Sequence, residues 1–258
     1  AHTLLLGINE AALYASFDLV SRRLLGHDLG ATRTALIALT SYAFNLNFGA
    51  LLGGMALRLR LYTRRGASTV IATQVIAWSL ASNWLGYGLT TGAVLAFAPP
   101  PVPSDWPLSQ GALRGVGGLL LALALAWLIA CARAQRHELR WRGHRLALPS
   151  LPVALLQATL SAGNWLLIGA IVWLLLGGAV DYPTTLATLQ LAAVAGVVTH
   201  VPAGLGVLEA VFIATLGERV GTPQLLAALL AYRAIYYLLP LAWAVPVYFL
   251  DEARPRTR

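Results

Sequence analysis

Two ionisable residues, Glu209 and Arg233, lie in strongly apolar sequence in the last quarter of the chain. Glu209 follows a Pro/Gly-rich stretch at 199–206, and Arg233 lies beyond Pro223. If both segments are helical, Glu209 is ~12 Å from Gly217 and Arg233 is ~15 Å from Pro223, at ~1.5 Å per residue. Charges in apolar surroundings are costly unless they are paired or functional. We therefore expect both side chains at similar depth, where they pair or share a ligand.

The stretch before Glu209 breaks a helix. Pro202 removes a backbone donor, and Gly204 and Gly206 tolerate positive φ. A helix that restarts at Val207 directs free N–H groups into the break, which favours anionic ligands. His200 lies beside the break and joins the candidates, although the commoner role of such a residue is a hydrogen bond at a helix end.

A second break lies in the N-terminal half, where asparagines and paired glycines interrupt apolar sequence at 45–54 before Arg58. Tyr236 and Tyr237 follow Arg233 on its helix, so they are expected to face the same ligand. Asp18 and Arg22 have i, i+4 spacing and predict a local helix pair outside the site. We predict no catalytic residue and no metal ligand, and the predicted binding residues are Asn45, Asn47, Gly53, Gly54, Arg58, His200, Pro202, Gly204, Gly206, Glu209, Arg233, Tyr236 and Tyr237.

The composition is that of an integral membrane protein, with 58% hydrophobic and 11% charged residues. The formal charge of +8 arises from short basic clusters between apolar runs, as topology determinants are placed, so no nucleic-acid partner is expected. All 18 basic residues are arginine, which excludes Schiff-base and P-loop lysine chemistry. No cofactor is predicted.

The pattern of apolar runs predicts an all-α, polytopic fold with about seven spanning helices and two oppositely oriented re-entrant hairpins. The arginine clusters place the C-terminus in the cytoplasm. Apolar segments predicted to cross the membrane lie at about 3–20, where Glu10 and Asp18 interrupt the apolar sequence, and at about 67–97, 111–132, 151–178 and 223–250. The predicted hairpins are 33–57 and 184–217.

These segments form one membrane domain, 1–258, with inverted halves at about 3–97 and 151–250. The helix at 111–132 links the halves and lets the second half start on the opposite side of the membrane. Gly111, Gly115 and Gly118 share roughly one face of this helix and are expected to pack closely against a neighbour. Since the sequence begins without Met or a basic signal-peptide start, we expect an earlier segment, such as a first helix, to precede it.

Several stretches of this sequence resemble the lysylphosphatidylglycerol synthase transmembrane-region family, over nearly the whole chain. The motifs of that family seen here are 200–209, 232–240 and 41–45, with Gly53, Gly54 and Arg58. Many members have two glycines after the proline, where this chain has Ala203-Gly204, and the multiple peptide resistance factors often have aspartate at the position of Glu209. The chain is thus more similar to the stand-alone members.

The resemblance implies a multi-pass protein of a bacterial cytoplasmic (inner) membrane that flips a phospholipid, including aminoacylated ones such as lysyl-phosphatidylglycerol. The resistance factors add a soluble synthase domain, and this sequence stops at Arg258, so we expect the polypeptide not to be the synthase itself. Two alternatives stay open: a membrane anchor or regulator of a separate lipid-modifying enzyme, and an intramembrane enzyme using Glu209 and His200. The expected partners are membrane phospholipid and such an enzyme, and self-association is left open.

Overall fold

The computed structural model describes residues 2–49, 54–103, 106, 109–133, 138–141 and 144–253. Helices dominate this part of the chain, and the all-α architecture is confirmed. A short antiparallel pair of strands joins α5 to α6, with Glu138 opposite Ala147. The elements are α1 (His2–Leu25), α2 (Ala31–Phe48), α3 (Leu57–Arg64), α4 (Thr69–Phe97), α5 (Gln110–Arg133), β1 (Glu138–Trp141), β2 (His144–Ala147), α6 (Leu151–Leu175), α7 (Tyr182–Thr199), η2 (Pro202–Gly204), α8 (Val207–Val220), α9 (Thr222–Arg233), η3 (Ala234–Leu238) and α10 (Leu239–Glu252).

Five helical segments among the described residues are long and apolar enough to cross a membrane. They are His2–Leu25, Gln110–Arg133, Leu151–Leu175, Tyr182–Thr199 and Thr222–Glu252. Four of them coincide with predicted spans, and the fifth is α7, which the sequence placed in a hairpin. The predicted span at 67–97 forms α4, a helix of 29 residues. The count of about seven spans stays a prediction.

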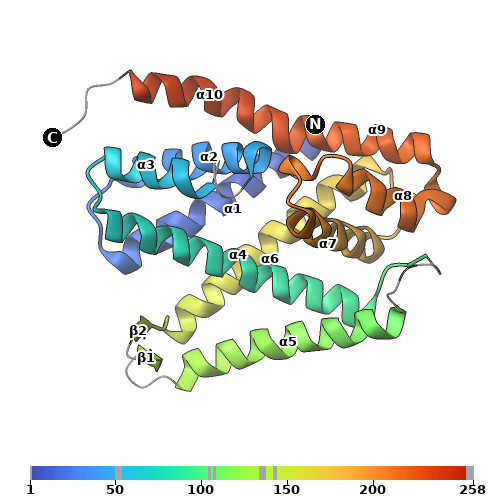
Figure 1. The fold of residues 1–258 in the computed structure, drawn as a ribbon, viewed down its shortest axis with the longest axis horizontal. Helices are drawn as coiled ribbons and strands as arrows, with labels where there is room; N and C mark the ends of the chain where they lie inside the picture. The colour runs from blue at the N-terminus through green and yellow to red at the C-terminus, as the bar shows by residue number, and fades with distance from the viewer. Residues whose placement is uncertain are drawn as a thin grey trace.

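The long helices α4 and α6 cross near the centre of the molecule, and α1 packs against α6 (Figure 1). The pair α2–α3 lies on one side of this crossing and the pair α7–α8 on the other, while α9 and α10 follow each other along one edge (Figure 1). Each pair packs against the long helix of the other half: α10 packs on α2, and α4 packs on α7. α5 lies outermost and packs against α4.

Glycines set the close crossings of the linking helix α5, although not the glycines that the sequence indicated. A Cβ at Gly117 would collide with the backbone of Ala96 and Gly92, and Gly92 in turn lies against Leu121. By contrast, added Cβ atoms at Gly115 and Gly118 would meet nothing within 4 Å. The prediction of a packing face through Gly111, Gly115 and Gly118 is therefore wrong, because the helix is rotated to place Gly117 on α4.

The chain reverses at both predicted breaks. After α7, positive φ angles occur at His200 (55°), Ala203 (55°), Gly204 (56°) and Gly206 (78°), and α8 then packs back against α7. After α2, Gly49 has a φ of 85°, and α3 packs back against α2. α2 also packs against η2, so the two breaks lie next to each other in space.

The apolar core lies mainly among α6, α7, α8 and α9. Ile171, Phe212, Leu225 and Leu229 are fully buried in it. Tyr42 of α2 and Tyr236 of η3 belong to the same cluster, so their hydroxyl groups are brought into the interior of the bundle. Burial of these hydroxyls requires hydrogen-bond partners, and those partners form part of the site.

Candidate functional site

Glu209 and Arg233 form a bidentate ion pair, as their expected depths predicted. Arg233 donates from Nε to Glu209 Oε1 at 2.6 Å and from Nη2 to Oε2 at 3.0 Å. Glu209 lies in the first turn of α8, where its Oε2 also accepts the N–H of Gly206 at 3.0 Å. The carboxylate thus caps the helix that restarts after the break and neutralises the arginine that ends α9.

Arg233 also closes the break itself. Its Nη1 donates to the carbonyl of Ala203 at 3.0 Å, and its Nη2 donates to the carbonyl of Gly204 at 3.0 Å. The guanidinium carbon lies 5.3 Å from the centroid of the Tyr237 ring. The guanidinium of Arg233 therefore donates four hydrogen bonds, two to the Glu209 carboxylate and two to backbone carbonyls of the turn that starts at Pro202. We call this arrangement the clasp, because it holds the turn and its left-handed residues in place.

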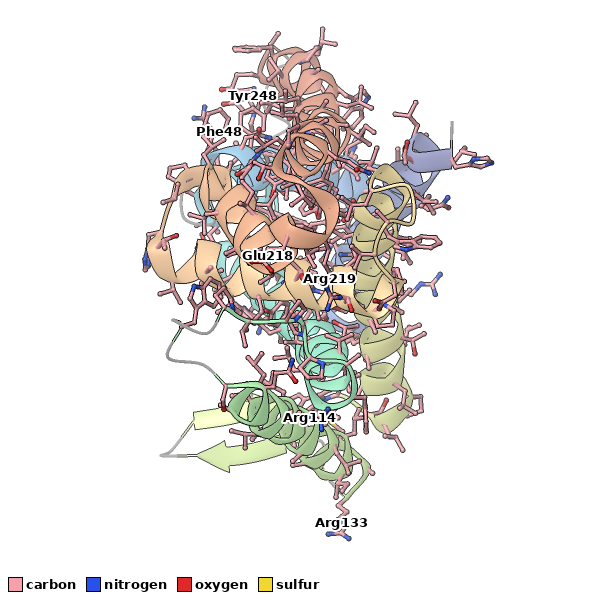
Figure 2. All side chains as sticks on the ribbon, turned by 90° about the vertical axis from the view of Figure 1, so that its right-hand side faces the viewer. Phe48, Arg114, Arg133, Glu218, Arg219 and Tyr248 are labelled. Carbon is pink, nitrogen blue, oxygen red and sulfur yellow. The ribbon has the colours of Figure 1, made fainter. Side chains whose placement is uncertain are left out.

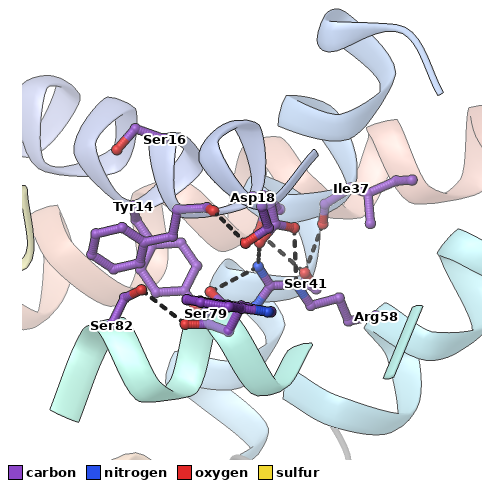
Figure 3. A network of polar contacts seen from close by, with 12 residues as sticks. Tyr14, Ser16, Asp18, Ile37, Ser41, Arg58, Ser79 and Ser82 are labelled. Atoms are coloured by element: carbon purple, nitrogen blue, oxygen red, sulfur yellow. Dashed lines mark hydrogen bonds and ion pairs between the residues drawn. The ribbon is translucent and has the colours of Figure 1, made fainter. Parts of the chain in front are cut away.

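A second buried ion pair joins Asp18 of α1 to Arg58 of α3, and Figure 3 shows their side chains pointing toward each other. Arg58 Nε donates to Asp18 Oδ2 at 3.1 Å, and its Nη2 donates to Oδ1. Tyr62 and Ser79 complete the cluster, through a 2.7 Å bond from Tyr62 to Asp18 Oδ2 and a 3.0 Å bond from Arg58 to Ser79 Oγ. The predicted Asp18–Arg22 pair is wrong, because Arg58 reaches Asp18 and Arg22 Nε donates to the Leu29 carbonyl instead.

A third polar group, around Glu10, lies at the centre of the bundle. The hydroxyls of Tyr42 and Tyr236 donate to Glu10 Oε1 at 2.7 Å and 3.4 Å, and they also contact each other. Asn164 of α6, with its amide oriented to satisfy its neighbours, donates to Glu10 Oε1 at 3.1 Å. Tyr236 was predicted to face the break, whereas it is buried against Glu10.

Aromatic rings connect the three polar groups. The ring of Tyr14 stacks on that of Tyr42 with centroids 3.7 Å apart, and its hydroxyl accepts from Arg58 Nη1 at 3.4 Å. On the other side, the rings of Tyr236 and Tyr237 lie 5.3 Å apart, and Tyr237 contacts Arg233. A polar and aromatic file, as we call it, therefore runs from Asp18–Arg58 through Glu10 to Glu209–Arg233.

The remaining predicted residues fall into different places. Asn47 Nδ2 donates to the carbonyls of Ala43 at 2.8 Å and Tyr237 at 3.1 Å, which ties α2 to η3. Gly54 provides room for Asn45, since a Cβ at Gly54 would lie 2.8 Å from Asn45 Oδ1. His200 is exposed and its Nδ1 contacts the Val198 carbonyl at 2.9 Å, so it points away from the file. Gly53 lies outside the described residues.

An open groove with a volume of about 200 Å³, which no sequence pattern indicated, lies between α2, α3 and α10. Its walls are largely apolar, and charged residues lie at one end: Arg33, and an ion pair between Arg65 and Asp251. Tyr248 lies in the wall, 5.7 Å between ring centroids from Phe44, and Figure 2 shows Tyr248 and Phe48 on the same side of the molecule. The lining residues are Arg33, Leu36, Ile37, Thr40, Leu61, Arg65, Val247, Tyr248, Leu250 and Asp251.

No protein-family model matches the chain. Comparison with known proteins finds two similar sequences, one named as an inner membrane protein and one as an uncharacterized protein. The inner membrane protein YbhN of Escherichia coli (strain K12) is 40% identical over 245 residues, which cover 95% of this chain and 77% of that protein. The uncharacterized protein slr0712 of Synechocystis sp. (strain ATCC 27184 / PCC 6803 / Kazusa) is 32% identical over 237 residues, or 90% of this chain and 73% of that protein.

Proposed function

The chain belongs to the family of the Escherichia coli inner membrane protein YbhN, and we propose that in the inner membrane it moves a phospholipid from one leaflet to the other. The apolar helices and this relationship make the chain a multi-pass inner-membrane protein.

The groove between α2 and α10 is the observation that carries this proposal. Apolar side chains such as Leu36, Val247 and Leu250 suit acyl chains, while the charged end suits a headgroup. Among the described residues, Arg33 forms no ion pair, so its guanidinium is free to contact a phosphate. The carboxylate of Asp251 lies at the same end and is paired with Arg65, so a headgroup that also carries an amine, as aminoacylated phospholipids do, would share this carboxylate with Arg65.

The two adjacent breaks support movement through the protein as well as binding. We propose that α1–α4 and α6–α10 are inverted repeats, each made of a long helix, a broken re-entrant hairpin and a further long helix. In each half, the hairpin packs against a long helix of the other half, α2 against α10 and α7 against α4, which is consistent with this arrangement. In such a design, the charged residues beside the breaks guide the headgroup through the membrane interior, and the resemblance to lipid-flipping membrane regions supports the same role.

The test is headgroup-resolved lipid translocation in proteoliposomes that contain only this chain. We expect phospholipid to cross between leaflets, and we expect Arg33→Gln to slow the process by about tenfold, the equivalent of one charge-assisted contact of ~1.4 kcal/mol. Arg114→Gln is the matched control, because Arg114 is an exposed arginine on α5, away from the groove (Figure 2). Absence of translocation would favour an anchoring role, and a change in lipid mass would indicate an enzyme.

The clasp at Glu209–Arg233 gives a second test of the same proposal. Arg233→Gln removes the donors to Ala203 and Gly204 and leaves Glu209 without its cation, so we expect a loss of ~3–5 kcal/mol in unfolding free energy, with Glu209→Gln similar and the double variant milder. If translocation needs an ordered break, the double variant folds and is inactive. Translocation at the wild-type rate by all three variants would exclude the clasp from the pathway.

A further inference from the structure

Glu10 is an acidic residue enclosed by the bundle. It lies on α1, a candidate membrane span, and only 2% of its surface is exposed. Three side chains from α2, α6 and η3 donate to it: Tyr42, Asn164 and Tyr236. A buried carboxyl with this many donors is a built polar site, because each donor has given up water to reach it.

No cation among the described residues balances this carboxyl. Within the part of the chain that the structure describes, no ion pair involves Glu10. The ionisable groups that face it are the phenols of Tyr42, Tyr236 and Tyr232. On the packed helix α4, Ser79 contacts Arg58 rather than Glu10, and Arg58 itself is occupied by Asp18. An ionised carboxylate without a cation in apolar surroundings is costly, and uptake of one proton removes that charge.

The donors allow both protonation states to stay hydrogen-bonded. When Glu10 is ionised, Tyr42 donates to it, and the single proton of Tyr236 goes either to Glu10 or to the Tyr42 oxygen. When Glu10 is protonated, its own O–H donates to one of the phenols, since a phenol oxygen also accepts. The hydrogen bond from Tyr236 to Glu10, at 3.4 Å, is longer and weaker than that from Tyr42, at 2.7 Å. Tyr236 can therefore change from donor to acceptor with a smaller loss of hydrogen-bond energy.

Tyr236 couples this change to the break. It belongs to η3, a π-helical turn of five residues that follows directly on Arg233. Single π-helical turns inside α-helices are rare, and they frequently lie at functional sites. Tyr42, the other donor, lies on α2, which packs against the turn η2 that Arg233 closes. A change at Glu10 therefore reaches both sides of the second break.

We infer that Glu10 is a reversible proton-binding site in the membrane interior and that its protonation drives the lipid movement proposed above. Glu10 would act as a proton carrier. Its carboxylate takes one proton from the aqueous side that is open to it, becomes neutral, and releases the same proton to the other side. No other bond forms or breaks. The coupling to lipid rests on the proposed function, whereas proton binding by Glu10 does not.

Proton binding is tested by infrared difference spectroscopy of the full chain in lipid, titrated from neutral to acidic pH. We expect a protonated-carboxyl band that disappears in Glu10→Gln and persists in Glu218→Gln, a change at an exposed glutamate near the end of α8 (Figure 2). Tyr42→Phe keeps the acid but removes a donor to its ionised form, so the midpoint of the band should move up by about one pH unit. A titration unchanged by Glu10→Gln or by Tyr42→Phe would overturn the assignment.

Coupling is tested by lipid translocation in proteoliposomes with an imposed pH gradient. We expect the gradient to accelerate translocation by the wild type and by Glu218→Gln, and to have no effect on Glu10→Gln, which is permanently neutral. A gradient response retained by Glu10→Gln would overturn the coupling. If the wild type moves no lipid under any gradient while the infrared titration still identifies Glu10, the proposed function fails and the proton site stands.

Discussion

At the residue scale, the ion pair of Asp18 and Arg58 is the buried contact whose disruption should lower the unfolding free energy most. Asp18 is fully buried and Arg58 is 4% exposed, so neither charge is solvated by water if its partner is removed. We expect Asp18→Asn to lower the unfolding free energy by ~3–5 kcal/mol, and the double variant Asp18→Asn/Arg58→Gln to be milder. Denaturant titration in detergent measures both.

Arg22→Gln is the control for this prediction. Arg22 lies on α1, as Asp18 does, but it is partly exposed and donates to a backbone carbonyl rather than to Asp18. Its replacement should cost less than the loss of either partner of the buried pair. Equal losses for Arg22→Gln and Asp18→Asn would contradict the assignment of Arg58 as the partner of Asp18.

His27, in the loop between α1 and α2, should make stability depend on pH. Burial lowers the pKa of His27 below its ordinary value of about 6.5, Arg22 lowers it further, and Asp28 opposes the shift. The folded protein therefore holds His27 neutral, whereas the unfolded chain takes up a proton once the pH falls below about 6.5. The contribution of His27 to stability should be constant above that pH and decline below it.

The measurement is the unfolding free energy of wild type and His27→Phe between about pH 5 and pH 8, the range in which histidine changes its charge. Phenylalanine keeps a ring beside Tyr62, whose centroid lies 6.0 Å from that of His27. His27→Phe should lose much of the decline at acidic pH, and His200→Gln, at an exposed histidine, should retain it. The same decline in His27→Phe as in the wild type would exclude His27 as its source.

At the scale of elements, Gly117 and Gly118 provide a matched pair on one helix. Alanine in a helix interior is favoured over glycine by ~1 kcal/mol, so Gly118→Ala, which meets nothing within 4 Å, should be neutral or stabilising. Gly117→Ala places its Cβ against the backbone of Ala96 and should instead destabilise by at least ~1–3 kcal/mol, because backbone cannot move aside as a side chain can. Thermal unfolding compares the two, and equal effects would mean that α5 and α4 do not cross at Gly117.

The breaks and the crossings differ in how far sequence could predict them. Pro202 and its neighbouring glycines terminate a helix wherever it packs, so the second break was predictable from local chemistry. The rotation of α5 was not, because Gly115, Gly117 and Gly118 are equally small, and only the shape of α4 decides which of them faces it.

At the scale of the whole molecule, the inverted arrangement predicts opposite sides for equivalent loops. In a Cys131→Ser background, single cysteines at the exposed positions Thr69, Ala179 and Ala253 can be labelled with an impermeant thiol reagent. We expect Thr69→Cys and Ala253→Cys to react from the cytoplasmic side and Ala179→Cys from the outside, because arginine clusters flank the first two. Labelling of 179 and 253 from one side would refute inverted repeats.

Long-range polar partners were beyond sequence reasoning. Glu10 and Asp18 are visible as acids inside an apolar helix, which was the signal that could have drawn attention to them. Their partners, however, come from α2, α3, α6 and η3, and nothing in the local pattern of α1 specifies which tyrosine or arginine packs there. Tyr236 shows the same limit, because its spacing from Arg233 indicated the break, while the π-helical turn directs it to Glu10.

The exchange of partners between the two halves also bears on how the chain is made. α2 needs α10 to cover one of its faces, and Asn47 finds an acceptor in the carbonyl of Tyr237, near the far end of the sequence. A ribosome delivers α2 to the membrane long before α10 is made, so Asn47 and the faces around it stay beside lipid or the insertion machinery until α10 follows. The first hairpin therefore completes its packing only after α10 has been made, and a chain truncated before α10 would leave this face of α2 uncovered even though its early helices had inserted.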